Sequence, residues 1–430
     1  MKNSFAQLLI DVQKKSGITV AAVRDVKNLK EEIESVTQLK IGFNTMRRFY
    51  GFLPSTVPSA ATLTLLSKYL GFSSYSSYVS NKLNYDEWYF QQKLLHLQLK
   101  NNLDDDAIAL MEIGLTNKNN IVSIANFITH LITQNDIQGL QFVFNSVSFQ
   151  NLTDSDCLKF STIVSFRLLA LEQKKAIQIY KALIPIRGFR NLVPLYYIDY
   201  THLGGMYSKI LELVQKSSNS HSDTLFVKLM LYYKSFYTTV AGSPKESVEL
   251  PSDYSSYHPV LKGRYVGYLI LKAEKIDKQT EKMVLNEFKK NKVSLFAQEV
   301  ITTLIIREAY ELLSKIFDTH YEDLFDTSSW SYKTIDSINL IGLANVNWNR
   351  QNYVSARRNL ELVELEKVEL GYFEYISMFY YLTKLKISAS ENDLKLNNLT
   401  QLALQSSIDK TNFVRFQDEM NKHLLVCSSN

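Results

Sequence analysis

The chain has 430 residues and a net charge of +5, with 46% apolar and 21% charged residues. This composition excludes a disordered chain, and the length exceeds one ordinary hydrophobic core, so we expect roughly two or three domains or one elongated array. Only 7 prolines and 14 glycines interrupt the sequence, fewer than a fold rich in strands and turns needs. The sequence therefore predicts an all-α protein.

The cysteines and the apolar stretches predict the compartment. Cys157 and Cys427 lie far apart and form no paired spacing, which predicts neither a disulfide framework nor a zinc site. The first residues lack the apolar run of a signal peptide, and no stretch reaches the ~18 apolar residues of a membrane span. We expect a cytoplasmic protein with no membrane association.

The positive charge is concentrated at the N-terminus. Residues 1–82 contain 11 Lys or Arg and 5 Asp or Glu, which gives +6, whereas residues 83–430 sum to −1. Such an asymmetry between segments is typical of contact with nucleic acid. If the chain binds DNA, we expect the N-terminal segment to do so.

This basic segment has the pattern of a small helical head. Apolar spacing predicts short helices after Gln7 and after Val23. A third helix follows and ends before Gly51, and Ser59 can cap a fourth helix, which Gly71 ends.

Two segments of the head, residues 41–53 and 58–72, carry a short series of motif elements. The elements are a Thr-x-x-Arg pair, a Gly, a Thr-Leu pair and a Leu-Gly-aromatic triplet, which here are Thr45 and Arg48, Gly51, Thr62 and Leu63, and Leu70, Gly71 and Phe72. With these elements the first 82 residues resemble a bacterial helix-turn-helix module of the Cro/repressor-like kind. Many bacterial proteins place such a head before varied C-terminal domains.

The resemblance implies a set of DNA-contacting residues. In such a module the second helix of the pair enters the major groove of double-stranded DNA, while phosphate contacts fix its register. An Asn side chain can bind adenine, and an Arg side chain can bind guanine, through paired hydrogen bonds. The resemblance assigns base reading to Asn44, Thr45 and Arg47, and phosphate contacts to Arg48, Lys40 and Lys30. Recognition of a palindromic operator also implies a homodimer.

Beyond residue 83 the chain alternates amphipathic helical stretches with short polar turns. Small residues recur in these stretches with separations of 32, 37 and 32 positions, at Ala107, Gly139, Ala176 and Ser208. This period is close to the ~34 residues of a helical-hairpin repeat. A small residue lets two antiparallel helices approach closely, and hairpins must then stack because none can bury its apolar face alone. We expect an α-solenoid of helical hairpins.

The repeat pattern is clearest at residues 340–366. The matching positions are Leu343, Ala344, Tyr353, Ala356 and Leu360. On these positions the array resembles tetratricopeptide (TPR) repeats, although the Trp, the first-helix Tyr and the closing Pro of that family are missing there.

The predicted organisation has four parts. A helix-turn-helix-like head at residues 1–82 precedes TPR-like repeats at 83–240, a loop or break at 241–260 that holds three of the seven prolines, and further TPR-like repeats at 261–430. Residues 318–334 and 217–223 are expected to form two further irregular segments.

No motif for catalysis or metal binding is present. The sequence lacks a phosphate-binding glycine loop, a paired-histidine metal helix, a nucleophile elbow and a deaminase signature. The seven histidines are dispersed, and residues 104–106, three consecutive aspartates, are explained by helix capping. We predict no catalytic residue, no cofactor, no metal and no enzymatic activity; an enzyme would require remote residues to converge in space.

Two functions remain open. The first is a DNA-binding transcriptional regulator whose helical-repeat body senses a peptide or protein, or mediates dimerisation. We expect most of the clustered tyrosines to lie in the core of this body, and the remainder could line a peptide-binding groove. The alternative is a non-enzymatic interaction scaffold or adaptor whose head does not bind DNA. A free basic helix face favours the regulator, whereas an exposed Phe43 and neutralised Arg47 and Arg48 favour the scaffold.

Overall fold

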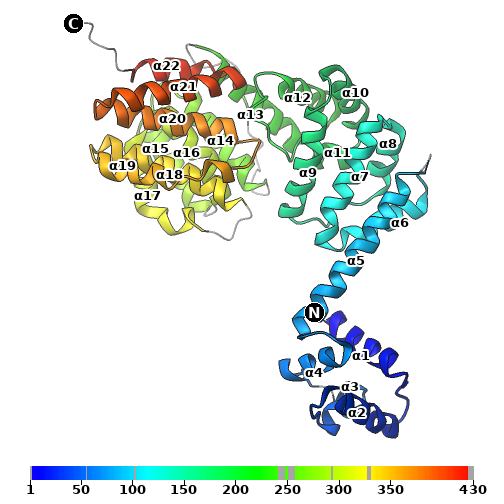
Figure 1. The fold of residues 1–430 in the computed structure, drawn as a ribbon. Coiled ribbons are helices and arrows are strands. Elements are labelled where there is room, and N and C mark those ends of the chain that lie inside the picture. Colours follow the sequence, from blue (N-terminus) through cyan, green and yellow to red (C-terminus); the bar gives the residue numbers. More distant parts are fainter. Residues whose placement is uncertain are drawn as a thin grey trace. The chain divides into compact units, whose positions relative to one another are not determined.

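A computed structural model gives the fold of the chain (Figure 1). It describes residues 2–54, 56–100, 103–240, 247–249, 257–291, 294–326 and 331–424. Helices make up most of these residues and none of them lies in a strand, so the predicted all-α class is confirmed. The chain divides into two compact units, Met1–Lys100 and Asn101–Asn430.

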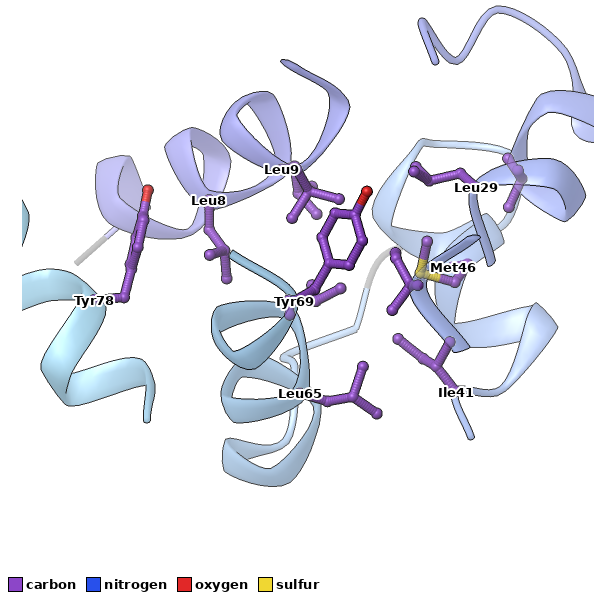
Figure 2. Packing of buried hydrophobic residues seen from close by; sticks show 12 residues of the cluster. Leu8, Leu9, Leu29, Ile41, Met46, Leu65, Tyr69 and Tyr78 are labelled. Atoms are coloured by element: carbon purple, nitrogen blue, oxygen red, sulfur yellow. The ribbon is translucent and has the colours of Figure 1, made fainter. Parts of the chain in front are cut away.

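The first unit is a small helical domain followed by a long helix. Its helices are α1 (Lys2–Ser16), α2 (Val23–Thr37), α3 (Phe43–Phe49), α4 (Ala60–Leu70) and α5 (Tyr75–Leu97). Residue 82, the expected end of the head, lies within α5. One apolar cluster joins all five helices, and Figure 2 shows Tyr69 of α4 in the middle of it, with Leu9 and Met46 nearby. Tyr69 is 1% exposed and Met46 is fully buried, so α3 is anchored by its apolar face.

The helix ends in the head follow from local sequence. The hydroxyl oxygen of Ser59 accepts the Thr62 N–H at 3.2 Å and caps α4. Gly71 ends α4 with φ of 102°, and Gly51 follows α3 with φ of 79°, a left-handed conformation that suits glycine. These three predicted boundaries are confirmed.

The first part of the second unit is a series of paired helices. It contains α6 (Asp105–Leu115), η1 (Lys118–Asn120), α7 (Ile121–Gln134), α8 (Ile137–Ser146), α9 (Asp154–Leu169), α10 (Gln173–Leu183), α11 (Arg187–Leu192), α12 (Met206–Ser217) and α13 (His221–Thr238). Helix α7 packs against α6, α8 and α9, and α10 packs against α8, α9 and α12. The four periodic small residues lie buried near the starts of α6, α8, α10 and α12.

The second part continues with longer helices. It contains α14 (Pro259–Lys272), α15 (Lys278–Lys290), α16 (Ser294–Ile306), α17 (Tyr310–Leu324), α18 (Tyr332–Asn349), α19 (Tyr353–Glu361), η2 (Leu365–Lys367), α20 (Phe373–Ser390), α21 (Leu394–Thr411) and α22 (Arg415–Asn421). Helices α14, α16, α18 and α20 pack in sequence, and α17, α19 and α21 each pack against the helix that precedes them (Figure 1). The predicted repeat at 340–366 falls on the α18–α19 pair.

Aromatic side chains connect the two parts of this unit. The Tyr237 ring of α13 stacks on Phe413 and Phe416 near α22, with centroids 5.0 and 5.7 Å apart. The Tyr200 N–H donates to the Gly371 carbonyl at 2.9 Å. A Cβ at Gly371 would lie 1.9 Å from the Ile198 carbonyl oxygen, so this close contact requires glycine. Most of the clustered tyrosines are buried, so they serve mainly as core, as expected.

Two expected irregular segments differ from the structure. Helix α17 continues to Leu324 with a kink at His320, where φ is −126° and ψ is 21°, and α18 begins at Tyr332. Most of the segment predicted at 318–334 is therefore helical, and Phe317, His320 and Leu324 are buried. Residues 327–330 of it lie outside the described part. Between α12 and α13 the loop is only residues 218–220. Of the predicted break at 241–260, residues 241–246 and 250–256 also lie outside the described part.

Candidate functional site

Helix α3 carries four of the six residues expected to contact DNA. It begins after Gly42 and has seven residues. Asn44 is exposed, whereas Thr45, Arg47 and Arg48 are half-buried. Because positions three and four apart share a helix face, Asn44 lies on the same side of α3 as both arginines.

The turn between α2 and α3 is held by one carboxylate. Oε1 of Glu34 accepts the Ile41 N–H at 2.8 Å, and Oε2 forms an ion pair with Lys30 at 2.7 Å. These contacts lower the pKa of Glu34, with the Lys30 hydrogen bond as the largest cause and the Ile41 bond next. Lys30 therefore stabilises the turn. Lys40 is exposed in the turn, and its charge also contributes to lowering the pKa of Glu34.

Arg47 contacts its own helix. Its Nη1 donates to Oδ1 of Asn44 at 3.4 Å, and its guanidinium lies 5.8 Å from the centroid of the Phe43 ring. Its Nε is buried and has no acceptor in the part of the chain that the structure describes. Phe43 is half-buried and packs against the head core, so it supports Arg47 and is not an exposed aromatic.

The charges of α2 and α3 are arranged differently. Each basic residue of α2 has an acidic partner within 4 Å: Arg24 with Asp25 at 3.6 Å, Lys27 with Glu31 at 3.9 Å, and Lys30 with Glu34 at 2.7 Å. Arg47 and Arg48 form no ion pair with any other described residue. Of the basic side chains on these two helices, only those of α3 therefore have no acidic partner among the described residues.

The second unit contains a buried polar network that sequence analysis missed. Arg264 of α14 and Glu299 of α16 form an ion pair at 2.9 Å, and their side chains are 2% and 1% exposed. The Tyr372 hydroxyl accepts from Arg264 at 2.7 Å and donates to Oε1 of Glu299 at 2.8 Å. The Tyr200 hydroxyl donates to Oε2 of Glu299 at 3.0 Å. Nε of Arg264 is buried and finds no acceptor among the described residues.

A cavity of about 460 Å³ lies beside this network. Its apolar wall includes Leu158, Leu195, Phe226, Val260, Leu261 and Leu295. Its polar lining includes Asp223, His258, Arg264, Gln298 and Glu369. A mainly apolar pocket of this size with a few convergent polar groups is the usual form of a small-ligand site.

Not every charged side chain around this pocket has a partner of opposite charge. Asp223 pairs with the buried Arg190 at 3.3 Å, and Arg264 pairs with Glu299. Glu369 has no cationic partner in the described ranges. Burial and, secondarily, the negative charge of Glu299 raise the pKa of Glu369 to about 7, against an opposing hydrogen bond from Thr334.

One further group in the pocket wall titrates away from its ordinary range. Burial lowers the pKa of His258, and the positive charges of Arg264 and Lys262 act in the same direction, while Asp154 opposes them. The imidazole is therefore neutral at pH 7, so the wall presents a neutral ring beside an unmatched carboxyl group.

Comparisons with known proteins add no assignment to these sites. No protein-family model, no curated protein and no solved structure matches the chain. In the described part of the chain, no helix combines the length and apolar character needed to cross a bilayer. The same residues contain no group of three or more His, Cys, Asp or Glu side chains placed to hold a metal ion.

Proposed function

We propose that the protein is a cytoplasmic, non-enzymatic, DNA-binding transcriptional regulator. In this proposal the head is a Cro/repressor-like helix-turn-helix module, with α2 and α3 as the helix pair and α3 in the major groove of double-stranded DNA. The second unit is a TPR-like solenoid that binds a peptide or protein, and a homodimer presents two heads to a palindromic operator.

The observation that carries the proposal is the charge on α3. The basic residues of α2 are each matched by an acid, whereas Arg47 and Arg48 are matched by none of the described residues. Phosphate binding favours cations whose charge is not already neutralised. The half-buried Phe43 also supports this assignment, because it packs against the head core and is not an exposed aromatic at the start of α3.

Within this proposal the six candidate residues have different roles. Asn44 and Arg47 already contact each other, so base reading requires that contact to be exchanged for contacts with base edges. Arg48 and the exposed Lys40 are suited to phosphates. Lys30 holds the turn through Glu34, so its role is to position α3.

The repeat-like arrangement supports a sensor or dimerisation role for the second unit. Four small residues at nearly equal spacing lie near the starts of alternate helices, and α14, α16, α18 and α20 pack one after another. Stacked helical pairs of this kind are typical of proteins that bind peptides or other proteins.

The test is selection of double-stranded DNA fragments of random sequence by the full-length protein, at low and near-physiological salt. The Arg47→Ala, Arg48→Ala variant should lose the enriched motif. The matched control is the Arg24→Ala, Lys27→Ala variant, which removes the same charge from α2 and should keep the motif.

A competing function is an interaction scaffold whose head does not bind DNA. It is favoured by the contacts of Arg47 with Asn44 and Phe43, which use this side chain inside the head. No binding at either salt concentration would support the scaffold. Salt-sensitive binding without a motif, equally weakened in both variants, would show an electrostatic contact without sequence reading.

A further inference from the structure

Helix α5 continues far beyond the apolar core of the head. Tyr78 and Val79 are its last residues in that core, whereas the helix ends at Leu97. In this distal part Phe90, Leu94 and Leu97 are buried. Because they are spaced by four and three residues, these side chains share one face of the helix, and that face is covered within the folded chain.

A second apolar stripe lies on the other side of the same helix. Trp88, Leu95 and Leu99 are 53%, 52% and 82% exposed. The N–H of Leu99 donates to the His96 carbonyl at 3.1 Å, so the helical turn continues to this residue. With 3.6 residues per turn, the three directions fall within about 40° of one another and point away from the buried face. Large apolar side chains exposed together in this way mark an interaction surface.

Gln92 completes the stripe. Residues 88, 92, 95 and 99 are separated by four, three and four positions, which is the spacing of the seam of a coiled coil. Gln92 is exposed, and a single polar residue at such a seam position is typical of parallel two-stranded pairs, in which it faces its own copy. An amide group contains both a donor and an acceptor, so two facing Gln92 side chains can form hydrogen bonds with each other.

The charge distribution on α5 also favours a second copy as the partner. Between residues 86 and 100 the acidic residues and lysines all lie about 100° or more from the centre of the stripe; they are Asp86, Glu87, Lys93 and Lys100. Like charges that face each other across an interface are unfavourable, and self-pairing through this stripe brings none together. A strongly charged partner would find no complementary group on the stripe.

We propose that this stripe of α5 is the interface between two copies of the chain, which pair in parallel and in register with the two Gln92 side chains facing each other. The proposal rests on the proposed function for the view that two heads act together, and it names the surface that joins them. In a parallel pair both heads lie at the same end of the two helices, and the two-fold axis runs between them. This arrangement suits a palindromic operator.

The length of the stripe determines how strong the dimer should be. From residue 88 to residue 99 a helix rises roughly 17 Å, so the interface is smaller than the roughly 1,200–2,000 Å² of stable complexes. We therefore expect a dissociation constant in the micromolar range, and we expect DNA with two half-sites to favour the dimer.

The first test is sedimentation velocity of the full-length protein without DNA, at about 1 to 100 µM, the range of a micromolar dissociation constant. The wild type should change from monomer to dimer with concentration. Leu95→Glu should weaken the dimer by about a hundredfold or more, because each subunit loses a buried leucine and gains a charge that faces its copy. The matched control is Leu402→Glu, at a 69% exposed position of α21, which should leave the dimer unchanged. Circular dichroism verifies that each variant is folded.

The second test locates the pairing by disulfide formation. In a chain that carries Cys157→Ser and Cys427→Ser, Gln92→Cys should form a linked dimer under mild oxidation. A disulfide requires Cα atoms within about 7 Å of each other, which an in-register parallel pair provides at position 92. The control is Lys93→Cys, which is also exposed but lies on another side of the helix, and it should not link.

The outcomes separate this proposal from the proposed function. A wild type that stays monomeric throughout the concentration range, an equal effect of Leu95→Glu and Leu402→Glu, or equal linking of the two cysteine variants would overturn the interface. A dimer that forms through Gln92 but selects no DNA motif would support the interface and contradict the DNA proposal. A monomer that selects a motif would do the reverse.

Discussion

The unmatched carboxyl group of Glu369 makes the stability of the second unit depend on pH. Its pKa is raised from 4.5 to about 7 in the folded protein, so the folded state favours the protonated form. The resulting stability is fully present below pH 4.5 and is lost as pH rises through 7. At about 1.4 kcal/mol for each pKa unit, this contribution reaches at most about 3 kcal/mol.

Replacing Glu369 with Gln removes the loss of stability that occurs as this carboxyl group ionises. Gln is a neutral side chain of the same shape, so the variant should resemble the wild type at pH 4.5 and should be more stable at pH 8, by up to about 3 kcal/mol. Urea unfolding followed by circular dichroism at the two pH values measures the difference, and subtracting the wild-type curve cancels every other titrating group. A difference between the two proteins that does not change with pH would refute this reasoning, as would the same pH dependence in Glu366→Gln.

Two further changes test other parts of the fold. Ser59→Ala should destabilise the head by about 1 kcal/mol because α4 loses its cap, whereas Ser73→Ala should not; thermal unfolding by circular dichroism compares them. Lys386 is 1% exposed, and burial lowers its pKa to about 8 against the opposing charge of Glu308. The stability of the wild type relative to Lys386→Met in urea unfolding should therefore rise between pH 8 and 10.5, and a difference that does not change with pH is the contrary result.

The helix ends of the chain could be predicted because their causes are local. Ser59 caps α4 and Asp104 caps α6 through hydrogen bonds to an N–H three residues later. Gly71 ends α4 in a left-handed conformation that suits glycine. Such features depend on a few adjacent residues, so the sequence contains the information needed to predict them.

The segment expected to be irregular at 318–334 is helical up to residue 324, apart from a kink at His320, and again from Tyr332. Its acidic and aromatic composition resembles a loop, but Phe317, His320 and Leu324 are buried. Packing against neighbouring helices overrides local preference in such a case, and that packing depends on distant parts of the chain.

The pocket could not be predicted because its residues are distant in sequence. Arg264 lies 35 residues before Glu299 and 108 before Tyr372, and no fixed spacing links such positions. One local signal was available: Arg264 lies between apolar residues that recur through α14, and a charged side chain is rarely buried without a partner. The candidate residues of α3 could be proposed from the sequence because they lie within one short segment, yet the contact between Arg47 and Asn44 is visible only in the structure.

The composition of the buried network around Arg264 is not explained by stability alone. A buried ion pair contributes little net stability, since apolar residues of similar volume often stabilise a core as well. Arg264 has a further disadvantage for a purely structural role, because its buried Nε lacks an acceptor.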